Sequence, residues 1–298
     1  MIYIFNFIII CFRLLPDKII IIISKIIYFC LCFLIRYRSK TIEENIKNSF
    51  PELDKRSRYK LKKDYYKVIS NYVTESMSFF AKGKNHIGRK LILDEQDTID
   101  TFSKSSGPTI LLSAHFGNWE VITSTLPTYF DIPVFGIYKP LNNKTIDKLV
   151  KEKRSQLRLQ LIPMNDALRY IKKYQNTASL FVFISDQGPA NMNNVVEVNF
   201  LNQRTPCLSG YQKIIQRFNL PAYYLKTVIE ETSYHCTFQK LSSNAVVQEY
   251  MSLLEKDILR QPPYWLWSHK RWKRAHLLPK IYINTRKCSN YCFYRKRT

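Results

Sequence analysis

Three short apolar runs, each followed by polar residues, constrain the fold of this chain most strongly. They are "PTILLSAH" at 108–115, "IPVFGIYKP" at 132–140 and "ASLFVFISDQGP" at 178–189. Each run is short and apolar enough to form a buried strand. Segments with a helical pattern separate them, at 118–127 and 143–159. Strands that alternate with helices predict an α/β fold with a mixed, largely parallel sheet flanked by helices.

The remaining sequence predicts further helices and one strand pair. Residues 57–81 carry apolar and aromatic side chains three to four positions apart, which predicts a long amphipathic helix. Residues 208–221 and 246–261 show the same helical pattern. Between them, residues 222–229 and 234–241 have strand character and are joined by "EETS", which predicts a hairpin.

The N-terminal 35 residues are the most hydrophobic part of the chain. Two apolar runs cover residues 2–12 and 19–35, and Ser24 and Lys25 interrupt the second. A helix that spans a membrane needs about 20 apolar residues. We therefore expect an N-terminal hydrophobic membrane-anchor helix that spans the bilayer or lies in its interface, with a buried core helix as the alternative. The basic residues at 36–40 predict that the following chain is cytoplasmic.

These patterns divide the chain into three parts. We expect a membrane anchor with its basic flank at 1–40, an α/β domain at 41–278, and a basic tail without assigned structure at 279–298. The 46 Lys and Arg residues exceed the 23 Asp and Glu residues, which gives a formal charge of +23. Such a chain favours acidic partners, namely nucleic acid, anionic lipid or an acidic carrier protein. The seven cysteines show no metal-site or disulfide spacing, so we expect reduced thiols and no metal.

Polar side chains follow each of the three predicted strands. The first delivers His115, the second Lys139, and the third Asp186 and Gln187. Parallel strands end at the same edge of a sheet, and open α/β sheets bind ligands at that edge. The sequence therefore predicts a base, a cation, an acid and an amide along one edge of the sheet.

The spacing of His115 and Glu120 limits how the two side chains can meet. On one continuous helix, five residues turn by about 500°, so the two side chains would point about 140° apart. They can meet only if the histidine lies in the turn before a helix, and Gly117 and Asn118 suit such a turn and its N-cap. Glu120 would then fix the imidazole tautomer. In the alternative, His115 bonds a backbone carbonyl and Glu120 complements the helix dipole.

Several ordered segments resemble the bacterial lipid A biosynthesis acyltransferases. "HFGNWE" at 115–120 looks like the H-x4-(D/E) motif of glycerolipid and lipid A acyltransferases. "ENIKNSFPEL" at 44–53, "YKP" at 138–140, "SDQGP" at 185–189 and "PPYWLWSHKRWK" at 262–273 are similar to further segments of that family. The resemblance covers roughly residues 1–275, and the ordered set is far more specific than the short H-x4-E motif alone.

The resemblance implies a reaction and its partners. A fatty acyl group would move from a thioester on acyl carrier protein, or on coenzyme A, to a hydroxyl of a lipid A precursor. It implies a membrane-bound enzyme on the cytoplasmic face of the bacterial inner membrane. We expect no cofactor, no metal, no nucleic-acid partner and a monomer. His115 would take the hydroxyl proton while Glu120 holds its ring, and the oxygen would attack the thioester without an acyl-enzyme.

Further residues are expected to bind substrate. Lys139 or Arg154 would stabilise the oxyanion or bind acceptor phosphates. Asp186 and Gln187 would bind the acceptor or hold the histidine loop. Cations alternate with tryptophans near the C-terminus, which suits an anionic headgroup at a membrane interface, unless the tryptophans pack in the core. The expected substrate-binding residues are Asn118, Lys139, Arg154, Asp186, Gln187, Lys270 and Arg271.

Two other functions compete with this interpretation. A glycerophospholipid-type acyltransferase would use the same histidine chemistry, but the "WSHKRWK" segment argues against it. A membrane-tethered nucleic-acid-binding protein would explain the positive charge and the tryptophan cluster. It would give no role to His115, Glu120 or "SDQGP".

Overall fold

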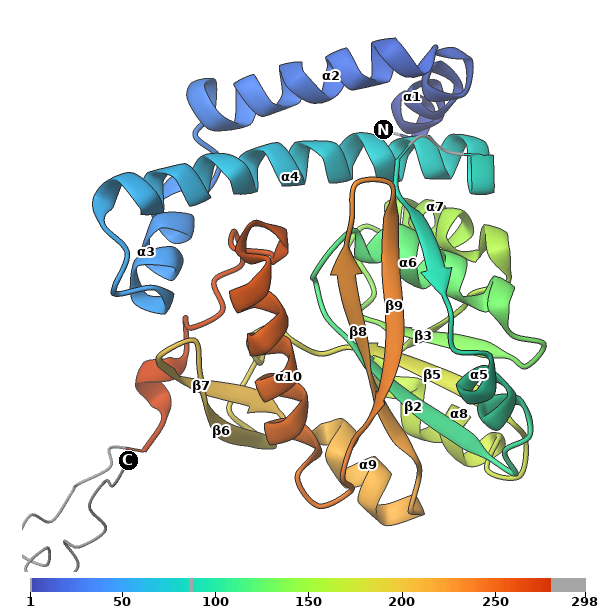
Figure 1. The fold of residues 1–298 in the computed structure, drawn as a ribbon. Helices are drawn as coiled ribbons and strands as arrows, with labels where there is room; N and C mark the ends of the chain where they lie inside the picture. Colours follow the sequence, from blue (N-terminus) through green and yellow to red (C-terminus); the bar gives the residue numbers. More distant parts are fainter. Residues whose placement is uncertain (1, 86–87, 280–298) are drawn as a thin grey trace, which may run out of the picture.

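The computed structural model describes residues 2–85 and 88–279, so the predicted tail lies outside the described residues except for Pro279. A seven-stranded sheet forms the centre, in the order β1-β9-β8-β2-β5-β3-β4 (Figure 1). Every pairing is parallel except β8 with β9, which confirms the predicted α/β class and the hairpin. The strands are β1 (Lys90–Leu93), β2 (Pro108–Ser113), β3 (Val134–Tyr138), β4 (Gln160–Pro163), β5 (Ser179–Ile184), β8 (Ala222–Ile229) and β9 (Ser233–Lys240).

A separate two-stranded sheet was not predicted. It pairs β6 (Val195–Phe200) with β7 (Gln203–Leu208) in antiparallel register. The two strands are joined by Leu201 and Asn202, which both adopt positive φ angles, of 50° and 60°. Positive φ at both central residues is typical of the two-residue turns that match the twist of a hairpin.

Helices cover the sheet and one of its ends. Those within the α/β region are α5 (Gln96–Ser103), α6 (Trp119–Thr125), α7 (Lys144–Arg154), α8 (Ala167–Lys173), α9 (Gly210–Phe218) and α10 (Val246–Arg260). The long helix predicted at 57–81 is α4 (Lys55–Lys82), and the Asp54 side chain caps it by accepting from Ser57 N at 2.8 Å. α4 crosses the end of the sheet at which β8 finishes (Figure 1).

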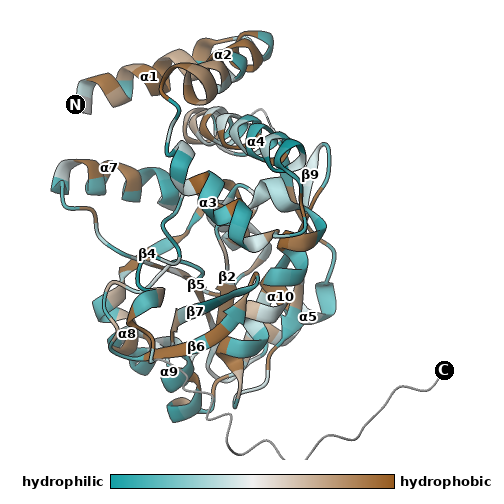
Figure 2. Cartoon of the chain, turned by 90° about the vertical axis from the view of Figure 1, so that its left-hand side faces the viewer, coloured by the Kyte–Doolittle hydropathy of each residue, from teal (hydrophilic) through white to brown (hydrophobic). Residues whose placement is uncertain are grey.

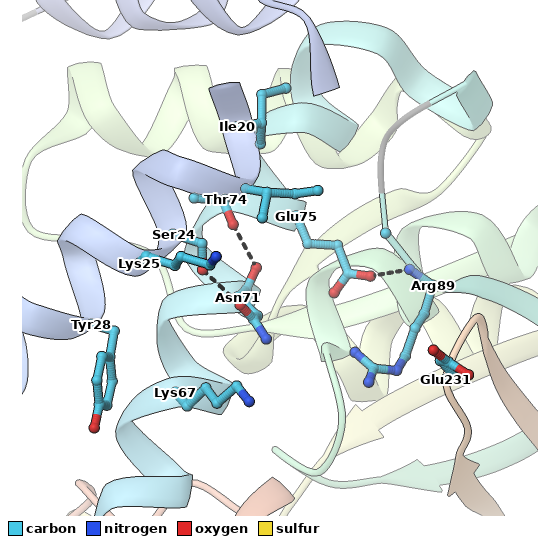
Figure 3. Close-up of a pocket in the computed structure, with 12 residues that line it drawn as sticks. Ile20, Ser24, Lys25, Tyr28, Lys67, Asn71, Thr74, Glu75, Arg89 and Glu231 are labelled. Atoms are coloured by element: carbon cyan, nitrogen blue, oxygen red, sulfur yellow. Dashed lines mark hydrogen bonds between the residues drawn. The ribbon is translucent and has the colours of Figure 1, made fainter. Parts of the chain in front are cut away.

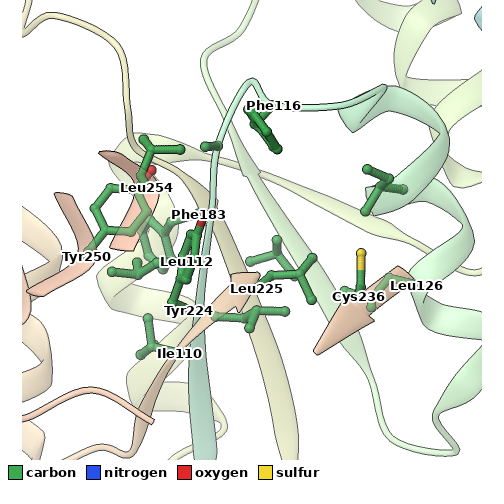
Figure 4. Packing of buried hydrophobic residues seen from close by; sticks show 14 of the residues in the cluster. Ile110, Leu112, Phe116, Leu126, Phe183, Tyr224, Leu225, Cys236, Tyr250 and Leu254 are labelled. Atoms are coloured by element: carbon green, nitrogen blue, oxygen red, sulfur yellow. The ribbon is translucent and has the colours of Figure 1, made fainter. Parts of the chain in front are cut away.

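The core is centred on β2. All six residues of this strand are buried, because β5 and β8 flank it and helices cover both faces. Ile110 lies opposite Phe181 on β5 and Ala222 on β8. Figure 4 shows Ile110 and Leu112 among the buried rings and aliphatic chains that surround this strand. Each fully buried side chain of this size contributes about 1.5–3 kcal/mol, so β2 is held firmly where it delivers its last residue.

The N-terminal apolar region forms two helices instead of one. α1 (Ile2–Leu14) and α2 (Asp17–Phe29) are separated by Pro16, and the α3 helix (Ser39–Ser49) follows after a bend. Both α1 and α2 lie against the outer side of α4 (Figure 1). Among the described residues, no single helix is long and apolar enough to cross a membrane. Asp17–Leu34 and Ser39–Ser49 pass that test only together, and they meet at 86°.

Candidate active site

His115 lies two residues after β2, in the turn that leads into α6. Gly117 in this turn has a φ of +68°, which confirms the prediction of a backbone angle that favours glycine. The turn directs the His115 side chain to the edge of the sheet, where 16% of it is exposed. The ring of Trp119 packs edge-on against the imidazole, with the ring centroids 4.8 Å apart.

The carboxylate that holds His115 is Asp186. Its Oδ1 accepts from the His115 backbone N–H at 3.1 Å and lies 2.7 Å from the imidazole Nδ1. Its Oδ2 accepts from the indole N–H of Trp265 at 2.9 Å. Asp186 is only 2% exposed, and burial disfavours its charge. The charge and hydrogen bonds of His115 and Trp265 outweigh burial and hold the pKa of Asp186 below its usual value.

The sheet register explains why Asp186 reaches His115. β2 and β5 are parallel neighbours in which Ser113 lies opposite Ile184, and Ser185 N donates to Ser113 O. His115 and Asp186 each lie two residues after the end of their strand, so they emerge side by side. The predicted meeting of His115, Asp186 and Gln187 is confirmed, because Asp186 contacts one nitrogen of the imidazole and Gln187 contacts the other. The predicted hold of Glu120 on the imidazole is wrong, because Asp186 occupies Nδ1 instead.

Gln187 contacts the other ring nitrogen. Its side-chain amide nitrogen lies 3.1 Å from His115 Nε2. Since Nδ1 faces a carboxylate, the consistent tautomer has Nδ1–H donating to Asp186 and Nε2 accepting from Gln187. His115 Nε2, which faces Gln187, is therefore the ring nitrogen that can accept a proton.

Glu120 forms an ion pair with Arg154 instead. The guanidinium Nε donates to Glu120 Oε2 at 2.7 Å, and Nη2 donates to Oε1. Glu120 lies in the first turn of α6 and Arg154 is the last residue of α7, so the pair also ties these two helices together. Burial opposes the charge of Arg154, but the hydrogen bonds to Glu120 raise the pKa of the guanidinium above its usual value. The side chains remain 28% and 18% exposed for Arg154 and Glu120.

Asn118 is held inside the protein. It is 1% exposed, its Nδ2 donates to Glu75 Oε2 at 2.8 Å, and its Oδ1 accepts from Ser76 at 3.1 Å. Asn118 occupies the N-cap position of α6, as predicted, but its side chain forms no cap bond to the helix. The Tyr234 hydroxyl also donates to Glu75 at 2.6 Å. Burial raises the pKa of Glu75, and its bonds to Tyr234 and Asn118 offset part of this effect.

No sequence motif marks Glu75 or Tyr234 as part of the site. One signal was available, because a glutamate stood among the apolar positions of a predicted amphipathic helix. Glu75 connects α4 to the turn that carries His115 through its bond to Asn118. Since a buried carboxylate is costly unless hydrogen-bonded, the complete set of partners makes this connection a rigid one.

The C-terminal tryptophan segment forms part of the active-site wall. Trp265 and Trp267 are buried, so the prediction that they face a membrane interface is wrong and the alternative of core packing holds for them. The segment runs along the histidine turn, where Gly117 N donates to Tyr264 O and Leu266 N donates to His115 O. This pairing brings Trp265 to Asp186, which no local sequence pattern signals.

The other predicted substrate-binding residues lie in different surroundings. Lys139 follows β3 and is exposed, as is Lys270. Arg271 is 1% exposed, and its Nη atoms donate to Pro206 O and to the Cys207 sulfur. Arg271 therefore lies beneath the surface, while Lys139 and Lys270 are available to a ligand from outside.

A cavity of about 770 Å³ lies between α2 and α4. Ile20 and Ile21 form part of its apolar wall, and Figure 3 shows Lys67 and Arg89 reaching into it from opposite sides. Glu75 lines its inner side and bonds Asn118 beyond it. The cavity is thus a neighbour of the histidine turn, separated from it by the Glu75–Asn118 contact.

Comparisons with known proteins identify the family. The profile of the family described as bacterial lipid A biosynthesis acyltransferase matches residues 1–274, which is most of the chain. A search of the curated proteins found no match. The activity of this family is acyl transfer in lipid A biosynthesis. The chain belongs to the bacterial lipid A biosynthesis acyltransferase family.

Proposed function

We propose that this protein transfers a fatty acyl group from a thioester donor, acyl carrier protein, to a hydroxyl of a lipid A precursor. One observation carries the proposal: a histidine at the edge of a parallel sheet is held at Nδ1 by a buried carboxylate. That arrangement leaves Nε2 as a base for a hydroxyl proton. The positive charge of the chain suits an acidic carrier protein as donor.

His115 acts as the general base in this proposal. The acceptor hydroxyl replaces the Gln187 amide at Nε2 and gives its proton to that nitrogen. The oxygen attacks the thioester carbonyl, the carbon–sulfur bond breaks, and the imidazolium returns the proton to the departing sulfur. Asp186 stabilises the imidazolium and fixes the ring in place. The chain needs no covalent acyl-enzyme for this sequence of steps.

Arg154 supplies positive charge for the transition state. Glu120 holds its guanidinium through two hydrogen bonds, and both side chains remain partly exposed. A fixed guanidinium stabilises a developing oxyanion or an acceptor phosphate better than a freely moving one. Glu120 is therefore a positioning residue for Arg154 in this scheme, while Lys139 and Lys270 remain proposed contacts of the anionic substrate.

The N-terminal helices suit attachment to a membrane. Figure 2 shows α1 and α2 as a hydrophobic pair on the outside of the molecule. Outward side chains such as Phe7, Ile22 and Phe29 are 66%, 49% and 53% exposed. Apolar side chains at this density on the surface mark a membrane or protein contact. With the basic residues at 36–40, they support residues 1–40 as an anchor on the cytoplasmic face of the bacterial inner membrane.

The proposal is tested by acyl transfer with the full-length protein in detergent. Labelled acyl carrier protein thioester and a lipid A precursor are the substrates, mass spectrometry detects the product, and acyl-coenzyme A serves as the alternative donor. His115→Ala should lower the rate by about 10³-fold, because general-base catalysis contributes roughly 10²–10⁴. His276→Ala, at an exposed position, is the matched control and should keep the wild-type rate. Wild-type protein without transfer activity, or full activity in His115→Ala, would refute the proposal.

A further inference from the structure

A small cavity of about 110 Å³ adjoins the active site on the side of the "SDQGP" turn. Gly188 and Pro189 form one wall, and side chains from the segment 269–274 form the other. One water takes up about 30 Å³ of liquid, so the cavity has room for roughly four waters. Sites for larger organic ligands usually measure about 300–1,000 Å³. The volume therefore suits a single small polar group and excludes a sugar ring or an acyl chain.

The lining of this cavity carries charge of one sign. Its charged residues are Lys270, Arg271, Lys273 and Arg274, and no carboxylate lines it. Within the described part of the chain, none of the four forms a salt bridge. The residues outside that part contain no Asp or Glu that could neutralise them. A concave site lined by one sign of charge concentrates ions of the opposite sign.

Two buried nitrogens at this site lack a hydrogen-bond partner within the described residues. They are Nε of Arg271, which is 1% exposed, and Nδ1 of His269. The Arg271 Nη atoms donate to a carbonyl and a sulfur, both uncharged acceptors. A buried guanidinium without an anionic partner is costly.

The cavity is fixed to the active site through the backbone. A Cβ on Gly188 would come within 2.8 Å of Arg271 O, so the turn and the cationic segment touch directly. Arg274 Nη1 donates to Pro189 O at 2.9 Å and closes the same contact. Gln187, the residue before Gly188, lies against His115 Nε2. The cavity and the catalytic histidine are therefore connected through the Gln187–Gly188 backbone.

We propose that this cavity is a phosphate-binding subsite that holds a phosphate group of one substrate. Phosphate matches the volume, the positive lining and the preference of Arg and Lys for phosphate oxygens. Two sources share this chemistry, namely a phosphate on the acceptor lipid and the phosphodiester that links the thioester arm to a carrier protein. The choice between them rests on the proposed function, whereas the binding of phosphate does not.

Titration with inorganic phosphate tests the subsite without turnover. The probes are full-length wild-type protein, Lys270→Gln/Lys273→Gln, and the matched control Lys172→Gln/Lys240→Gln, in which all four lysines are exposed. Calorimetry should show saturable binding to the wild type and the control, and about tenfold weaker binding to the Lys270/Lys273 variant, because 1.4 kcal/mol corresponds to a factor of ten. Equal affinity in all three proteins, or no saturable binding to the wild type, would overturn the subsite.

Transfer kinetics identify the source of the phosphate. If the acceptor supplies it, the Lys270/Lys273 variant should raise KM about tenfold for the phosphorylated acceptor and leave KM unchanged for a dephosphorylated one. If the donor supplies it, the rise should appear with acyl carrier protein and disappear with an N-acetylcysteamine thioester, which has no phosphate. Equal changes with and without phosphate would overturn the proposal. Wild-type protein that binds phosphate but transfers no acyl group would overturn only the proposed function.

Discussion

Two carboxylates are candidates to act on the proposed catalytic base, and their surroundings differ. Asp186 is 2% exposed and accepts from His115 and from the Trp265 indole. Glu120 is 18% exposed and pairs with the guanidinium of Arg154. Asp186 therefore belongs to a buried, fully bonded network, and Glu120 to a surface-edge ion pair. The difference assigns the two acids different tasks, one on the imidazole and one on a cation.

The comparison also shows how sequence distance misleads. Glu120 is five residues from His115, whereas Asp186 is 71 residues away. Parallel pairing of β2 with β5 brings the distant residue into contact, while the start of α6 directs the near one toward α7. Contacts at the ends of parallel strands depend on register, which a local spacing argument does not contain.

The largest effect is expected from Asp186→Asn. The amide keeps the shape but removes the charge that stabilises the imidazolium, and it can force the wrong tautomer on His115. Similar substitutions of a carboxylate behind a catalytic histidine cost about 10⁴ in rate. We expect a loss of about 10³–10⁴ in the rate of acyl transfer, measured under single-turnover conditions. Circular dichroism should show a folded protein, and a loss below tenfold in that folded variant would mean that Asp186 does not act on the base.

A smaller loss is expected from Glu120→Gln. The variant leaves His115 and Asp186 bonded but weakens the hold on Arg154, so transition-state charge is stabilised less well. We expect a loss of about 10- to 100-fold in kcat, with Arg154→Lys causing a similar loss. Because the two residues form one unit, the double variant should lose little more than either single one. A loss as large as that of Asp186→Asn would place Glu120 in direct contact with the reacting groups.

A stability effect is expected at the connection between α4 and the histidine turn. Glu75→Ala removes the acceptor of Asn118 and Tyr234 and leaves both donors buried. Each buried donor that loses its partner costs about 1–3 kcal/mol, so we expect the free energy of unfolding to fall by about 2–6 kcal/mol. Urea unfolding measures it, with the exposed Glu52→Ala as control. An unchanged midpoint would show that this network does not hold the turn.

The smallest expected effect is a pH dependence of the stability that Asp186 contributes. The pKa of Asp186 is lower in the folded protein than its usual value near 3.9, so the folded state favours its charged form. Its contribution to stability is therefore complete above about pH 4 and is lost as the pH falls through the folded-state value. The difference in the free energy of unfolding between wild type and Asp186→Asn should therefore become smaller below about pH 4. Urea unfolding at several pH values measures this difference. A difference that stays constant there would contradict a lowered pKa.

Much of the architecture could be predicted from the sequence, because continuous apolar runs indicate buried strands and apolar residues at helical spacing indicate a helix that packs on one face. The strands that carry His115 and Asp186 and the helix α4 were identified in this way. Four strands were not predicted. β1 and β4 have only four residues each, and β6 and β7 form a partly exposed hairpin, so none of these strands gives a strong apolar signal.

The contacts of the site were less predictable than its location. The sheet edge follows from the order of strands and polar residues. The bond from Trp265 to Asp186 and the ion pair between Glu120 and Arg154 join segments 79 and 34 residues apart. Such contacts depend on how the helices and strands pack against one another. The sequence could therefore indicate the site residues but not which of them contact each other.

Nuclear magnetic resonance of ¹⁵N-labelled histidine tests the central claim most directly. A short hydrogen bond to a buried carboxylate should give His115 Nδ1 a slowly exchanging, strongly downfield proton. The account predicts that this proton is present in the wild type, retained in Glu120→Gln and absent in Asp186→Asn. A proton that survives in Asp186→Asn but disappears in Glu120→Gln would contradict it and return the orienting role to Glu120.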